Sequence, residues 1–163
     1  MLHAVFLAHK WRGDYTLRTM EMKLAPLFTL PDEQGRAVSL ADFKGKKNVL
    51  LVFYPGDLTP GCSMQLSEIR DDWAKFNARD TVVFGINHAE SDSHAAFIKK
   101  CSLPFHLLTD AGRTVSTRYG ATKKFRNVRV ITRTVIVVNT DGKIIYEKHG
   151  RPKNMEILQA IKT

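Results

Sequence analysis

The sequence predicts an α/β protein with a central mixed β-sheet flanked by helices. Two observations lead to this class. Apolar runs of strand length alternate with segments of helical periodicity, and the last two predicted strands form an antiparallel hairpin. The length of 163 residues favours one domain, and no repeat or linker divides it. We expect an N-terminal extension over residues 1–22 and a folded domain over residues 23–163.

Each element follows from a local pattern. The run 48–54 (NVLLVFY) is continuously apolar, as in a strand buried on both faces of a sheet. The other predicted strands are 28–30, 37–40, 81–86, 105–108, 129–138 and 143–147. Helices are expected from Pro60 onward and at 91–100, 111–119 and 154–161. The helix from Pro60 has an apolar stripe with spacings of four and three: Cys62, Leu66, Ile69, Trp73 and Phe76.

The chain carries a formal net charge of +9, and many of its cations lie in residues 122–133. There they alternate with Val128, Val130 and Ile131, which indicates a loop running into a strand with one solvated face. Nucleic-acid binding is the competing interpretation of such a cluster, but the segment lacks aromatic or groove-reading features. We therefore expect no nucleic-acid partner.

The sequence also bears on the compartment. No apolar run reaches the roughly 20 residues that cross a bilayer, so we expect no membrane association. Residues 2–8 are apolar but lack the flanks of a secretion signal. The basic N-terminus is interpreted as a tail or an upstream start before Met20 or Met22, with organelle targeting as the alternative. Two cysteines are too few for a disulfide framework or a zinc site, so we expect a reducing compartment, the cytoplasm.

One of these cysteines, Cys62, lies in the segment YPGDLTPGCS, directly after the buried strand. Thr59 suits the helix cap and Pro60 the first helical position, so Cys62 falls in the first turn. A buried cysteine on an apolar stripe is often only a small hydrophobe. At a helix N-terminus, however, free N–H groups and the helix dipole favour the thiolate, which is the nucleophilic form.

The sequence argues against two other kinds of thiol chemistry, dithiol exchange and hydrolysis by a cysteine nucleophile. A Cys-x-x-Cys pair is absent, because the position three residues after Cys62 is Gln65. No histidine lies in a recognisable hydrolase motif, although His88 follows a predicted strand. The reduction of a peroxide requires less: a thiolate, hydrogen-bond donors for two oxygens and a dry pocket.

The spacing Pro55-x-x-x-Thr59-x-x-Cys62 resembles the active-site motif of the peroxiredoxins, and most closely that of the Q-type, or bacterioferritin comigratory protein, subfamily. The resemblance runs from about Lys23 to the end of the chain. It includes the segments 25–30 (APLFTL), 107–110 (LLTD) and Arg133-Thr134. It implies a thioredoxin-like fold with an N-terminal β-hairpin, and no metal, haem or flavin.

The resemblance also implies a role for each motif residue. Cys62 would be the peroxidatic nucleophile that becomes a sulfenic acid. The Thr59 hydroxyl would hydrogen-bond the thiolate and the peroxide, and Arg133 would stabilise the thiolate and the transition state. Pro55 would shield the sulfur from water, and the N–H groups of Gly61 and Cys62 would donate to the substrate.

This chain differs from the Q-type pattern at the position of the resolving cysteine, the second thiol that would react with the sulfenic acid. Many Q-type members carry it five residues after the nucleophile, where this chain has Ser67. Ser67 is either natural to a member that lacks this thiol or a substitution for cysteine. Cys101, near the end of the next helix, is the other candidate, about one turn late. Otherwise an external thiol resolves the sulfenic acid.

We therefore expect a thiol peroxidase that reduces hydrogen peroxide and alkyl hydroperoxides. The resemblance implies electrons from thioredoxin, glutaredoxin or a small thiol. It also implies a monomer, with a dimer as the alternative. A hypothesis of a different class is a redox sensor or chaperone-like binding protein that is switched by oxidation of Cys62. Turnover with a reductant distinguishes the two.

Overall fold

A computed structural model describes residues 22–161. The extension predicted for residues 1–22, and its targeting role, therefore lie almost wholly outside the described residues. The strands are β1 (Thr29–Pro31), β2 (Ala37–Ser39), β3 (Asn48–Phe53), β4 (Thr81–Asn87), β5 (His106–Thr109), β6 (Thr122–Phe125), β7 (Val128–Ile131), β8 (Thr134–Val138) and β9 (Ile144–His149). The helices are the 3₁₀ turn η1 (Leu40–Phe43), α1 (Pro60–Asp71), α2 (Trp73–Asn77), α3 (Ser91–Cys101), α4 (Thr114–Arg118) and α5 (Asn154–Ala160). Within this part of the chain, no helix combines the length and apolarity that a membrane crossing requires.

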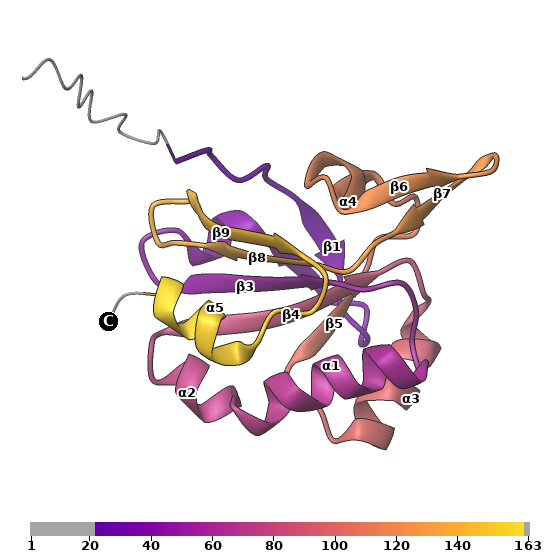
Figure 1. Ribbon diagram of the computed structural model, residues 1–163, viewed down its shortest axis with the longest axis horizontal. Coiled ribbons are helices and arrows are strands. Elements are labelled where there is room, and N and C mark those ends of the chain that lie inside the picture. The colour runs from indigo at the N-terminus through magenta and orange to yellow at the C-terminus, as the bar shows by residue number, and fades with distance from the viewer. Residues whose placement is uncertain (1–21, 162–163) are drawn as a thin grey trace, which may run out of the picture.

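A five-stranded sheet with the order β5-β4-β3-β8-β9 forms the centre of the molecule (Figure 1). The strands β5, β4 and β3 are parallel, whereas β8 and β9 are antiparallel to their neighbours. The sheet is therefore mixed, as predicted. β1 and β2 form the predicted N-terminal hairpin outside it.

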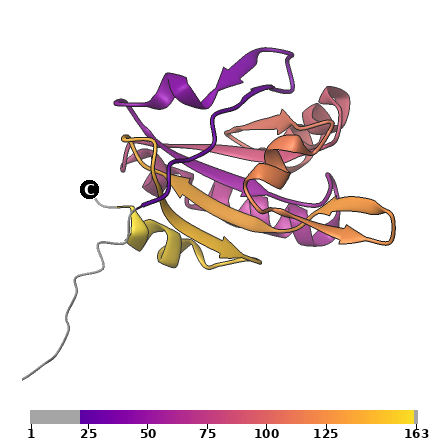
Figure 2. The same cartoon turned by 90° about the horizontal axis from the view of Figure 1, so that it is seen from above.

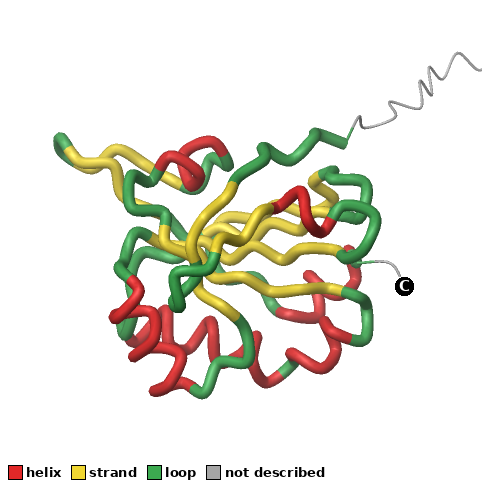
Figure 3. The backbone as a smooth tube through the Cα atoms, turned by 180° about the vertical axis from the view of Figure 1, so that it is seen from behind, coloured by secondary structure: helices red, strands yellow, loops and turns green. Residues whose placement is uncertain are grey.

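The two faces of the sheet are covered differently. Leu50 and Val52 of β3 pack in a core with residues of α1, α2, α3 and α5, and Figure 3 shows most of the helices gathered on one side of the strands. Val49 and Leu51 face a second core, built by the β1–β2 hairpin, η1 and α4. The alternation of side chains along a strand explains why the continuous apolar run 48–54 serves both cores.

Two predicted elements are interrupted in the structure. The strand expected at 129–138 is divided into β7 and β8, because its two halves pair with different strands. The Thr132 N–H still donates to the Ala121 carbonyl beside β6 at 2.8 Å, whereas Thr134 pairs with β3 and β9. The helix expected to run from Pro60 to Phe76 breaks at Asp72, whose φ of −102° and ψ of 11° are not helical. The interruption at Thr132 matters for the site, because Arg133 follows it.

Two other predictions differ in extent or type. The basic segment 122–133, predicted to be a loop running into a strand, contains a complete hairpin formed by β6 and β7. Figure 2 shows this hairpin standing out from the body of the protein. The helix predicted at 111–119 is shorter, since α4 begins at Thr114, after Arg113 with a left-handed φ of 57°.

Candidate active site

The loop between β3 and α1 places Cys62 as the sequence predicts. Thr59 is the N-cap residue of α1, with extended backbone angles, and Pro60 occupies the first turn. Cys62 is the third helical residue, is fully buried and is a free thiol. The free N–H groups and the positive end of the α1 dipole are therefore directed towards the region of its sulfur.

The predicted side-chain cap is wrong. Thr59 stands at the cap position, but its hydroxyl makes no capping bond and instead donates to the Gly56 carbonyl at 3.4 Å. The hydroxyl is thus engaged in the turn that precedes the helix. The first-turn N–H groups of α1 consequently receive no side-chain acceptor from Thr59.

Arg133 reaches Cys62 from the opposite side of the site, 71 residues later in the chain. Its Nη1 donates to the Cys62 Sγ at 3.4 Å. The backbone on both sides of Arg133 is fixed, because Gly150 N–H donates to the Arg133 carbonyl at 2.8 Å and Thr134 is in register with Phe53 of β3. The structure therefore brings together a thiol and a fixed cation, as predicted.

Gly61 makes this contact geometrically feasible. A Cβ atom at this position would lie 2.5 Å from the Arg133 Nη2 and 3.3 Å from its Cζ. These separations are shorter than van der Waals contact, so the guanidinium lies where the side chain of any other residue would be. From its place in the motif Gly61 was expected to contribute only a backbone N–H, and no local pattern in the sequence indicates this steric role.

Pro55 lies exposed at the start of the loop, next to the fully buried Tyr54. Cys62 has no exposed surface. The role of Pro55 as a shield for the sulfur remains a prediction.

A buried polar network beside the nucleophile was not anticipated. The Asp57 carboxylate accepts hydrogen bonds from the Tyr54 hydroxyl at 2.7 Å and the Asn87 amide at 2.8 Å. It also accepts a bond from the Ser93 hydroxyl at 2.8 Å and pairs with the His94 Nδ1 at 2.8 Å. The network joins the active-site loop to the end of β4 and the first turn of α3. Only the presence of Asp57 in this loop hinted at it, since all its partners except Tyr54 lie 30 or more residues away.

Burial makes this network energetically important. The Asp57 side chain is 3% exposed and the His94 side chain is not exposed at all. Burial raises the pKa of Asp57, but the hydrogen bonds from His94 and Tyr54 outweigh it and leave the pKa below its ordinary value. The other ring nitrogen of His94, Nε2, is buried without a hydrogen-bond partner. The ionised Asp57 carboxylate therefore holds the active-site loop against β4 and α3.

Ser67 and Cys101 lie away from this centre. Ser67 is half-buried, more than one turn beyond Cys62 in α1. Cys101 is the last residue of α3, and its carbonyl accepts a bond from the Arg70 Nη1, near the end of α1, at 2.5 Å. The first turn of α3, in contrast, is held at the active-site loop by His94. Cys101 therefore lies at the end of α3 that is remote from the loop contact of His94, and both cysteines are free thiols.

Two other groups of titratable side chains, at His88 and around His106, do not form a second catalytic or metal site. His88 makes no bond through Nδ1, and its pKa is lowered by burial and by the charge of Arg113. Asp32, Glu33 and His106 hold their ligand atoms within 4.8 Å of one another, but they bond to each other, to Arg36 and to backbone N–H groups. This cluster is accounted for as an ionic contact between the β1–β2 hairpin and β5.

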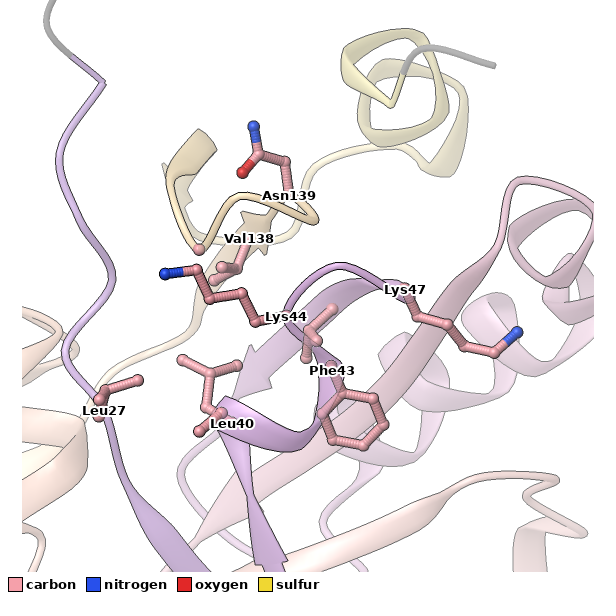
Figure 4. Close-up of a pocket in the computed structure, with 10 residues that line it drawn as sticks. Leu27, Leu40, Phe43, Lys44, Lys47, Val138 and Asn139 are labelled. Atoms are coloured by element: carbon pink, nitrogen blue, oxygen red, sulfur yellow. The ribbon is translucent and has the colours of Figure 1, made fainter.

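A pocket of about 110 Å³ lies between η1 and the end of β8 (Figure 4). Its lining is mainly apolar, from Leu27, Leu40, Phe43 and Val138, with Lys44 and Lys47 at its edge. None of its lining residues is a cysteine, histidine or acid. The pocket therefore offers no thiol, imidazole or carboxyl group.

The steric role of Gly61 can be tested by replacing it with alanine. The added methyl group should displace the Arg133 guanidinium from Cys62 and slow the reaction of the thiol with hydrogen peroxide by on the order of 10- to 100-fold. Stopped-flow measurement of Cys62 oxidation gives the rate. Gly56→Ala is the matched control, because its Cβ would meet only the Thr59 Cγ2 at an ordinary 3.8 Å. Equal rates for Gly61→Ala and the wild type would contradict the steric account.

Removing the Asp57 carboxylate should strongly destabilise the fold. Asp57→Ala leaves His94 and three further donors without their acceptor, so we expect a loss of roughly 3–5 kcal/mol in unfolding free energy. Urea denaturation measures it, and Asp71→Ala is the control, because Asp71 is 66% exposed and Arg70 is its one ion-pair partner in the described part of the chain.

The pH dependence of this stabilisation follows from the lowered pKa. The contribution of Asp57 is fully present above the ordinary carboxyl pKa of 3.8 and is lost as the pH falls through the lower folded value. The difference between wild type and Asp57→Ala should therefore shrink below about pH 4. A difference that is small at pH 7 would show that Asp57 does not anchor the loop.

Comparisons with known proteins identify the family to which this chain belongs. Residues 22–147 match the AhpC/TSA family. A chloroplastic peroxiredoxin Q from Sedum lineare is 38% identical over 144 residues, which cover 84% of this chain and 76% of the relative. A peroxiredoxin bcp from Coxiella burnetii is 39% identical over 127 residues, covering 74% of this chain and 82% of the relative.

Solved structures show the same fold. The peroxidoxin BcpB of Mycobacterium tuberculosis superposes with a TM-score of 0.79 at 25% identity, covering 87% of this chain and 97% of that one. A PrxQ variant from Xylella fastidiosa gives a TM-score of 0.76 at 21% identity, covering 85% and 94% of the two chains. The predicted thioredoxin-like fold is thus confirmed, and the chain belongs to the AhpC/TSA family as a Q-type peroxiredoxin.

Proposed function

We propose that Cys62 and Arg133 form the reaction centre of a thiol-dependent peroxidase that reduces hydrogen peroxide and alkyl hydroperoxides. The enzyme class follows from membership of the peroxiredoxin family. The observation that carries the assignment of residues is the 3.4 Å contact between Arg133 Nη1 and the Cys62 Sγ in the first turn of α1. Family membership favours turnover over the sensor hypothesis.

In the first half-reaction the Cys62 thiolate attacks one peroxide oxygen. An S–O bond forms as the O–O bond breaks, and the leaving oxygen departs as water or an alcohol after taking up a proton. Cys62 becomes a sulfenic acid, so sulfur is oxidised by two electrons and the peroxide is reduced by two. The fixed Arg133 guanidinium stabilises the thiolate and the negative charge that develops on the oxygens.

The other motif residues would position the substrate. The N–H groups of Gly61 and Cys62 lie in the first turn of α1, where the helix dipole favours a developing negative charge. The Thr59 hydroxyl, bound to the Gly56 carbonyl in this structure, would turn towards a bound peroxide to donate to it. Pro55 would limit the access of water to the sulfur.

We propose that an external thiol resolves the sulfenic acid. The first turn of α3 touches the active-site loop through His94, and Cys101 lies seven residues further along α3. At 1.5 Å per residue it is displaced by about 10 Å along the helix. A disulfide requires Cα atoms within about 7 Å of each other. Ser67 lacks a thiol, so neither position offers a resolving partner in the folded state.

The second half-reaction then balances with two equivalents of thiol. The first attacks the sulfenic sulfur, forms a mixed disulfide and releases water. The second attacks the mixed disulfide, which restores the Cys62 thiol and releases an oxidised disulfide product. Thioredoxin, glutaredoxin or a small thiol would supply these electrons, and we place the enzyme as a monomer in a reducing compartment such as the cytoplasm.

Mass spectrometry of the intact protein tests the resolving step. After one equivalent of hydrogen peroxide with dimedone, we expect one adduct on Cys62 and a free thiol on Cys101. Cys62→Ser should lose all peroxidase turnover. Cys101→Ser should retain turnover with dithiothreitol within about two-fold, because an external thiol does the work of resolution.

Two outcomes would contradict this proposal. A loss of two hydrogens with a Cys62–Cys101 cross-link would make Cys101 the resolving thiol and require unwinding around α1. No rapid oxidation of Cys62 would overturn the assignment of the nucleophile.

A further inference from the structure

The β6–β7 hairpin is a structural feature that the peroxidase reaction leaves without a role. It projects from the body beside α4 (Figure 1). Among residues 22–161 its strands pair only with each other, from Thr122 opposite Ile131 to Phe125 opposite Val128. Four residues per strand make this hairpin, residues 122–131 and called the arm below, about 13 Å long.

The arm carries a concentrated positive charge. Its exposed cations are Lys123, Lys124, Arg126 and Arg129, and residues 122–131 contain no acid. Within residues 22–161, no ion pair involves these four side chains. Lys124 and Arg129 are directly opposite each other, an arrangement of like charges that is destabilising in an isolated hairpin. An acidic partner would relieve this repulsion.

The tip of the arm adds an exposed apolar pair. Phe125 is 57% and Val128 55% exposed, and they face each other across the last rung of the ladder. The Arg126 guanidinium lies 5.6 Å from the centre of the Phe125 ring. An aromatic residue with a neighbouring arginine is a composition typical of the energetic centres of protein interfaces.

The base of the arm is connected directly to the reaction centre. Ala121 and Thr132 close the hairpin through a 2.8 Å hydrogen bond, and the next residue, Arg133, contacts Cys62. In Figure 1 the arm and the start of α1 lie at the same end of the molecule. A protein held on the arm would therefore be adjacent to the oxidised sulfur.

We propose that the β6–β7 hairpin docks an acidic dithiol protein that reduces the sulfenic acid of Cys62. This inference rests on the proposed function and extends it to the surface that selects the reductant. The cations attract the acidic surface over a distance, and Phe125 and Val128 pack against an apolar patch beside its dithiol. A second copy of this chain fits less well than an acidic protein, because the whole chain carries a formal net charge of +9.

The test compares two reductants in steady-state peroxidase assays. The probe is an acidic thioredoxin, kept reduced by its reductase and NADPH, and dithiothreitol is the reductant that needs no docking. For Lys124→Glu/Arg129→Glu we expect kcat/KM for thioredoxin to fall by on the order of 10-fold or more and to lose its dependence on ionic strength. Turnover with dithiothreitol should remain unchanged. Phe125→Ser/Val128→Ser should lower kcat/KM for thioredoxin and leave its salt dependence in place.

Lys44→Glu/Lys46→Glu is the matched control. It makes the same change in net charge at exposed positions in the turn that follows η1, against the opposite face of the sheet from α1. This control should keep most of the thioredoxin activity. An equal loss in both charge variants would show that only net charge matters and would overturn the docking surface.

The remaining outcomes separate this proposal from the proposed function. Cys62 that is not oxidised by peroxide would refute the peroxidase itself. Normal turnover with dithiothreitol but none with thioredoxin, or thioredoxin turnover unaffected by the hairpin variants, would refute only the docking surface. Hairpin-dependent binding to duplex DNA or to vesicles containing phosphatidylserine, with thioredoxin kinetics unchanged, would assign the arm to a different partner.

Discussion

The contact between Arg133 and Cys62 is the interaction on which the arrangement of the site depends. It joins the first turn of α1 to the junction of β7 and β8, two segments 71 residues apart. Three local features meet there. Pro60 begins α1, Gly61 leaves space for the guanidinium, and Arg133 lies in the short break between β7 and β8. A small change at any of these would separate the charge from the sulfur.

A second constraint holds the nucleophile's loop from behind. Asp57 lies between Tyr54 at the end of the central strand and the start of α1, and it is tied to β4 and α3 by buried hydrogen bonds. The network stabilises the loop because the Asp57 carboxylate is paired with four groups, whereas an unpaired buried charge is costly. The same tie fixes the first turn of α3 at the site and therefore leaves Cys101 at the far end of that helix.

The parts that could be predicted from sequence are those determined by local pattern. The apolar run 48–54, the helix start at Pro60 and the turn before β9 each have a local signature, and Cys62 and Arg133 follow from the resemblance to peroxiredoxins. The break at Thr132 and the pairing of Asp57 with His94 have no local signature. Both depend on groups that are close only after folding: β3 in one case and α3 in the other. The Thr59 hydroxyl was mispredicted because two acceptable bonding partners compete for it within one turn.

The most direct test of the central claim is the rate of Cys62 oxidation by hydrogen peroxide in Arg133→Met and Arg133→Lys, measured by stopped-flow fluorescence at neutral pH. The account predicts a loss of on the order of 100-fold or more for methionine, because the fixed charge is removed. It predicts an intermediate rate for lysine, which restores a point charge without the planar fork of donors. A methionine variant that reacts within about three-fold of the wild type would contradict the claim that this contact activates the thiol.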